Sequence, residues 1–145
     1  MSFITREPWL LWATLSAVFA AMTAILAKIG VADIDSDLAT AIRTVIIMVM
    51  LAAIVFWKGA HQQIAAVSAK TYVFLAFSGI ATGASWLCYF KALQIGDASR
   101  VAPIDKLSVV LVAIFGLIFL GEHLDTRGWL GVSLIGAGAI VLAIK

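Results

Sequence analysis

The stretch WLLWATLSAVFAAMTAILA, residues 9–27, carries no charged residue, and about 20 mostly apolar residues are enough for one helix to cross a bilayer. The whole chain agrees with this stretch, because 63% of its 145 residues are hydrophobic and only 12% are charged. An ordinary soluble domain is about 45–50% apolar and about 25% charged, and it needs that charge to cover its surface. The composition therefore excludes a soluble enzyme, a disordered tail and a disulfide scaffold. It predicts an integral membrane protein.

Four further apolar stretches follow the first, so we expect an all-α, polytopic membrane protein with five transmembrane helices. The first stretch is longer than the ~7–15-residue apolar core of a signal peptide, and we interpret it as a retained helix. The connections are short and leave no room for a soluble catalytic domain, which predicts a single domain over residues 1–145. The expected helices span residues 9–27, 38–57, 71–90, 101–121 and 128–144.

Two residues mark expected helix starts. Asp37 precedes the second apolar stretch and is predicted to cap that helix, since aspartate is a preferred residue at a helix N-terminus. Pro103 follows a break at residues 96–99 and is predicted to open the fourth helix. Four glycines in the fifth stretch, at positions 128, 131, 136 and 138, favour close backbone approach and indicate a packing or dimer helix.

Positive charges divide almost evenly between the two faces of the membrane. With five spans, one face carries Arg6, Lys58, Lys70 and Arg127, and the other carries Lys28, Lys91, Arg100, Lys106 and Lys145. An excess of Lys and Arg normally fixes the cytoplasmic side, so this near tie permits insertion in both orientations. A single orientation fixed by other features is the alternative. Two oppositely inserted copies of a unit with an odd number of helices form an inverted repeat of the kind transporters use.

Three charged residues fall within the expected spans: Arg43 in the second, and Asp105 and Lys106 near the start of the fourth. A charge at mid-bilayer costs about 2.5–3.5 kcal/mol on insertion scales, so such residues are candidates for function. Arg43 has Thr40 and Thr44 on the same helix face at helical spacing, whereas the alternative is that it snorkels to the headgroups. For Asp105 and Lys106 the alternative is structural capping, and Lys106 is also placed to meet a carboxylate on another helix.

A polar stripe runs along one face of the third expected helix. In lipid this stripe has to face other helices or a water-filled cavity, and we interpret it as a cavity lining rather than as packing contacts alone. Its residues are Ser78, Thr82, Ser85, Trp86 and Tyr89.

From Tyr89 onward the sequence resembles the EamA domain of the drug/metabolite transporter superfamily. The resemblance rests on Phe90, Ala92 and Leu93, the Ala102–Pro103 pair, the 120–122 Leu-Gly-Glu sequence, and the glycines at 128, 136 and 138. Arg43 falls where that family usually has an arginine, and residues 102–110, APIDKLSVV, resemble those of single-domain bacterial and archaeal members. The resemblance implies a five-helix unit, half of an inverted-repeat transporter fold, that dimerises around a central cavity in the plasma (inner) membrane.

These observations predict a membrane transporter that moves a small metabolite or amino-acid-like solute by alternating access as an antiparallel homodimer. Arg43 and Lys106 are expected to hold an anionic or zwitterionic group. The full set of expected solute-binding residues is Arg43, Thr44, Thr82, Ser85, Trp86, Tyr89, Asp105 and Lys106.

Two alternatives remain. The first is efflux of cationic compounds in the manner of small multidrug-resistance proteins, but the first helix offers only Ser16 and Thr23 where such exchange needs a carboxylate. The second is a non-transporting membrane subunit that packs against a partner. We expect no catalytic residues, since no acid–base or nucleophile–base pair has a recognisable spacing. Cys88 and the two histidines, at 61 and 123, show no metal-site spacing, and a net charge of +2 gives no sign of nucleic acid. No cofactor is expected.

Overall fold

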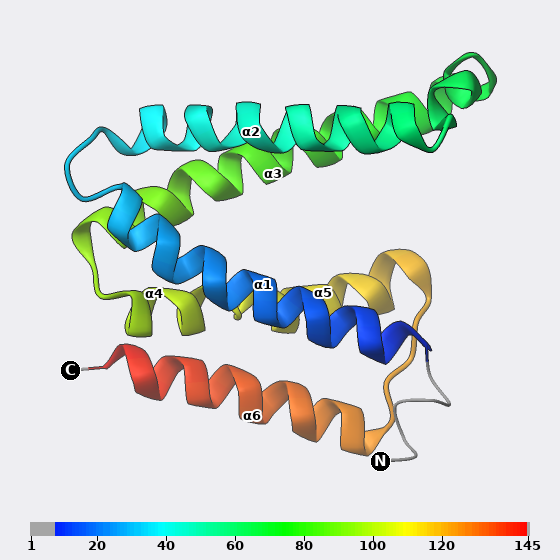
Figure 1. Ribbon diagram of the computed structural model, residues 1–145. Helices are drawn as coiled ribbons and strands as arrows, with labels where there is room; N and C mark the ends of the chain where they lie inside the picture. Colours follow the sequence, from blue (N-terminus) through cyan, green and yellow to red (C-terminus); the bar gives the residue numbers. More distant parts are fainter. Residues whose placement is uncertain (1–7, 145) are drawn as a thin grey trace. The chain divides into compact units, whose positions relative to one another are not determined.

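The computed structural model describes residues 8–144, and the regular structure in that range is entirely helical (Figure 1). Five of its segments are long and apolar enough to cross a membrane, which confirms the expected all-α fold with five spans. Two of the counted cations, Arg6 and Lys145, lie outside the described residues. The elements are α1 (Pro8–Gly30), α2 (Ser36–Trp57), the 3₁₀-helix η1 (Ala60–Ala66), α3 (Ala69–Ile95), α4 (Ala98–Asp105), α5 (Ser108–Phe115), the π-helical turn η2 (Gly116–Leu120) and α6 (Thr126–Ala143).

The chain divides into two compact units, one of residues 27–94 and the other of residues 8–26 and 95–144. In the 27–94 unit, the end of α3 is tied to the loop that precedes α2. The Lys28 ammonium donates a hydrogen bond to the Leu93 carbonyl at 2.7 Å, and the Gln94 amide donates to the Ile34 carbonyl at 2.9 Å. Val31 and Leu93 are fully buried beside these bonds. Backbone carbonyls at the helix end thus find donors, which the bilayer interior does not supply.

The helix α2 is capped by Asp35, which corrects the prediction that Asp37 is the cap. One carboxylate oxygen of Asp35 accepts hydrogen bonds from the amides of Asp37 and Leu38, at 2.9 and 3.1 Å. The backbone is extended at Asp35, so its side chain reaches back to these first-turn amides. Asp37 already lies inside the first turn, and its carboxylate is left for other contacts.

The fourth span is broken, whereas the sequence predicted one helix over residues 101–121. The helix α4 begins before Pro103, at Ala98, and ends at Asp105, and α5 starts at Ser108. Pro103 lies inside α4, and a proline ring crowds the carbonyl four residues before it, so Pro103 does not explain a break that comes after it. At the break the amides of Lys106 and Leu107 bond three residues back, each at 3.0 Å.

In the unit of residues 8–26 and 95–144, α6 packs against α4 and α5. Gly136 is buried at this contact, where a β-carbon would lie 3.2 Å from Val110 Cγ2. Gly131 and Gly138 have open space where their β-carbons would lie. The glycine at 136 therefore serves packing within the chain, and the glycines at 131 and 138 leave a smooth surface on α6.

Candidate functional site

A groove of about 510 Å³ runs between α2 and α3, wholly within the 27–94 unit. One wall comes from the first two turns of α2 and the other from the middle of α3. Two glycines, Gly79 and Gly83, open the α3 wall, since nothing lies within 4 Å of where their β-carbons would be. The lining residues are Asp37, Thr40, Ala41, Thr44, Leu75, Ser78, Gly79, Thr82, Gly83, Trp86 and Leu87.

Three threonine hydroxyls of the groove donate their protons to their own helix backbones. Thr40 donates to the Ser36 carbonyl at 2.8 Å, Thr44 to the Thr40 carbonyl at 2.7 Å, and Thr82 to the Ser78 carbonyl at 2.9 Å. Serine and threonine commonly bond back to the carbonyl four residues earlier in this way. A hydroxyl whose proton is used still has lone pairs, so these three oxygens present acceptors.

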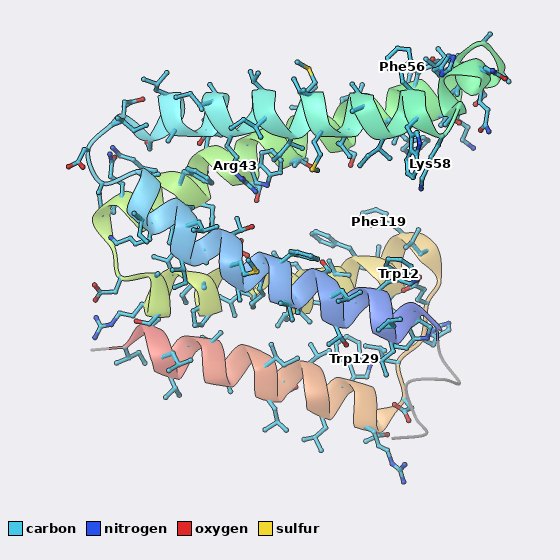
Figure 2. The ribbon with its side chains drawn as sticks, in the orientation of Figure 1. Trp12, Arg43, Phe56, Lys58, Phe119 and Trp129 are labelled. Atoms are coloured by element: carbon cyan, nitrogen blue, oxygen red, sulfur yellow. The ribbon has the colours of Figure 1, made fainter. Side chains whose placement is uncertain are left out.

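Arg43 lies next to the groove and contacts its wall through Trp86. The guanidinium carbon stands 4.4 Å from the centroid of the Trp86 ring and 5.2 Å from that of Phe90. Figure 2 shows the side chain leaving α2 on the side of α3. A cation over an aromatic face is stabilised by the ring quadrupole, by about 0.5–2 kcal/mol. Arg43 is thereby held against the aromatic rings of α3.

The structure brings four of the predicted site residues together. Thr44, Thr82 and Trp86 line the groove, and Arg43 stacks on Trp86. Ser85 and Tyr89 follow on α3 but lie outside the groove lining. The Tyr89 ring meets the Phe90 ring edge-on, with centroids 6.5 Å apart. The single stripe predicted on α3 thus divides between the groove and its flank.

Asp105 and Lys106 lie in the other unit, at the break of the fourth span, and pair with each other. The Lys106 ammonium is 3.1 Å from the Asp105 carboxylate, and the two side chains are 54% and 38% exposed. The sequence predicted that Lys106 is placed to meet a carboxylate on another helix. In the structure the helix ends between the two residues, and the tight turn lets neighbouring side chains meet. Broken helices in transporters are where solute and ion sites form.

Reasoning from the sequence missed Asp37, the one carboxylate in the groove. A signal was present, because Asp37, Thr40 and Thr44 follow one another at spacings of three and four residues, which places them on one helix face. Assigning Asp37 to the cap left Asp105 as the only carboxylate counted within a span. Among residues 8–144 there is no group of three or more His, Cys, Asp or Glu side chains placed to hold a metal ion.

Comparison with known proteins identifies the family. The model of the EamA-like transporter family matches residues 7–144. A protein of Sinorhizobium sp. named as an uncharacterized transporter in the cobO 3′ region is 59% identical over 138 residues, which are 95% of this chain and 98% of that protein.

More distant relatives carry a more specific name. The probable 4-amino-4-deoxy-L-arabinose-phosphoundecaprenol flippase subunit ArnE of Hamiltonella defensa is 27% identical over 73 residues, 50% of this chain and 66% of that protein. The subunit of the same name in Pseudomonas fluorescens is 25% identical over 88 residues, 60% of this chain and 75% of that protein. No solved structure matches the chain.

Proposed function

We propose that this chain, a membrane transporter that belongs to the EamA-like transporter family, moves a small metabolite or amino-acid-like solute by alternating access as an antiparallel homodimer. The observation that supports this proposal best is the groove between α2 and α3, with Arg43 held beside it on Trp86. A cationic side chain, several hydroxyl oxygens and an indole together suit a small solute that is part polar and part apolar.

A second copy of the chain completes the path. Asp37, Thr44, Ser78 and Thr82 line the groove and are exposed in the single chain. Lipid tails offer polar groups no hydrogen-bonding partner, so this face turns to protein or water rather than to lipid. A partner copy over the groove encloses a polar route, and the near tie of positive charges allows that copy to insert the other way up. The plasma (inner) membrane is the proposed location.

The proposed solute contacts follow the sequence prediction. Arg43 and Lys106 hold an anionic or zwitterionic group, and Thr44, Thr82, Ser85, Trp86 and Tyr89 line the route. Asp105 keeps Lys106 in place through their ion pair. The Asp105–Lys106 pair lies where α4 gives way to α5, and a helix break of this kind is a natural place for a spanning segment to bend.

A second candidate function is a membrane subunit that works only with a different partner chain. It is favoured by the two distant relatives, both of which are named as flippase subunits. The glycine surface of α6, with Gly131 and Gly138 open, suits a partner helix equally well.

Uptake by the purified chain alone tests the proposal. Vesicles that contain only this protein are expected to take up members of a radiolabelled amino-acid mixture, saturably and faster than protein-free vesicles, because the homodimer needs no other chain. The rate should rise with the square of protein content where dimers are sparse. Uptake that appears only after a partner chain is added contradicts the homodimer and supports the subunit function.

A further inference from the structure

We infer that the groove between α2 and α3 binds the ammonium group of an amine-bearing solute, with the Asp37 carboxylate as its charge partner. This inference deepens the proposed function, because it names the chemical group that the transport path recognises. It begins from the charge of the groove. Asp37 is the only ionisable residue among those that line it.

Asp37 lies in the first turn of α2, where its negative charge is favourable to the helix dipole, but it is not the cap. The cap is Asp35, and the Asp37 carboxylate accepts a long hydrogen bond of 3.5 Å from the Ser36 hydroxyl. Within residues 8–144 no cation lies within 4.0 Å of it, since the ion pair found there joins Lys106 to Asp105. A carboxylate at a groove wall with no cation beside it can form a charge-assisted hydrogen bond with a bound ammonium.

Three neighbouring threonine oxygens are acceptors as well. Thr40, Thr44 and Thr82 donate their hydroxyl protons to backbone carbonyls, so their oxygens offer lone pairs to whatever fills the groove. An ammonium has three donors and no acceptor, and it matches such a wall. A carboxylate would meet the like charge of Asp37 there, although the Ser78 hydroxyl and the Trp86 indole N–H also line the groove and can donate.

The guanidinium of Arg43 does not neutralise this wall. It stacks on Trp86 and Phe90 and is absent from the groove lining, and in the part of the chain that the structure describes it forms no ion pair with Asp37. Trp86 itself lines the groove, together with Leu75 and Leu87. The site therefore suits an amine with a compact apolar or aromatic body, whose ring lies against these side chains.

Three probes of the same shape and different charge test the inference: radiolabelled phenethylamine, neutral phenethyl alcohol and anionic phenylacetate. Equilibrium dialysis against the purified full chain in detergent gives their affinities. Phenethylamine is expected to bind about tenfold or more tighter than the alcohol, because hydrogen bonds to charged groups exceed neutral ones by that margin. Phenylacetate is expected to bind more weakly than the alcohol.

Asp37→Asn is expected to remove this preference, lowering phenethylamine affinity about tenfold while leaving the alcohol unchanged. Asp37→Glu keeps the negative charge and is expected to retain much of the preference for phenethylamine. Asp33→Asn is the matched control, since Asp33 lies in the loop just before α2 and does not line the groove. The inference is overturned by any of three results: equal effects of Asp37→Asn and Asp33→Asn, binding of phenylacetate as tight as that of phenethylamine, or no saturable binding of the amine.

The amine could belong to a free solute or to a phosphatidylethanolamine headgroup, since both carry an ammonium. To assign the source, phenethylamine binding that depends on Asp37 is measured in nanodiscs with and without phosphatidylethanolamine. If this lipid abolishes the binding, the site holds the headgroup. If the binding does not change, the site holds the free amine. Transport is measured separately. Amine binding through Asp37 without uptake contradicts the proposed transport alone, whereas uptake that Asp37→Asn leaves intact contradicts the ammonium site alone.

Discussion

Arg43→Ala is expected to reduce uptake of the transported solute into vesicles about tenfold or more, with normal amounts of protein in the membrane. The guanidinium is held against Trp86 and Phe90 beside the groove, and a hydrogen bond to a charged group contributes about 1.5–3 kcal/mol. Removing it lowers solute affinity and unfixes the Trp86 ring that forms part of the groove wall. Initial uptake rates across a range of solute concentrations measure the effect.

We expect the Arg43→Ala variant to insert into the membrane normally. A charged residue within a span costs about 2.5–3.5 kcal/mol on insertion scales, so alanine at position 43 makes α2 easier to insert. Arg43→Lys keeps the charge and loses the planar stack, and we expect an intermediate rate. Lys58→Ala, at the end of α2 and outside the groove, is the matched control. Wild-type uptake by Arg43→Ala contradicts the role assigned to this residue.

Gly83→Leu is expected to stop transport by occupying the groove. Gly83 lines the groove on α3, and no atom lies within 4 Å of where its β-carbon would be, so a leucine side chain enters free space without displacing the helix. A solute that enters the groove then crowds against the leucine side chain. This overpacking costs about 1–3 kcal/mol of binding free energy and lowers uptake about tenfold or more. Uptake rates and thermal unfolding in detergent are measured on the same preparation.

The matched control is Gly30→Leu. Gly30 also has nothing within 4 Å of its β-carbon position, but it lies at the end of α1 and does not line the groove. We expect Gly30→Leu to transport as the wild type does and both variants to unfold near the wild-type temperature. Full activity of Gly83→Leu would show that the solute takes another route.

The five spans could be predicted from the sequence because each is a run of about 20 mostly apolar residues, a signal that needs no knowledge of the fold. The positions at which the helices begin and end were harder to predict. Asp33, Asp35 and Asp37 all precede α2, each of them a good cap, and only the backbone conformation at Asp35 decides among them. Pro103 suits the first turn of a helix, whereas in the structure it lies inside α4, which begins at Ala98.

Part of the candidate site could be predicted from the sequence. Ser78, Thr82 and Trp86 recur at helical spacing on α3, and that periodicity located part of the groove. The stacking of Arg43 on Trp86 joins residues far apart in the chain, and no local pattern contains it. Asp37 shares a helix face with Thr40 and Thr44 in the sequence, but its place in a groove appears only when α3 supplies the opposite wall.

Topology tests the central claim of an antiparallel homodimer most directly. Reporters active only inside or only outside the cell are fused in turn after Lys145 of the full chain, and each activity is normalised to the amount of fusion protein. The nearly even division of Lys and Arg between the two faces predicts that both reporters give strong signals, because copies insert in both orientations. A strong signal from one reporter and none from the other would contradict the antiparallel homodimer.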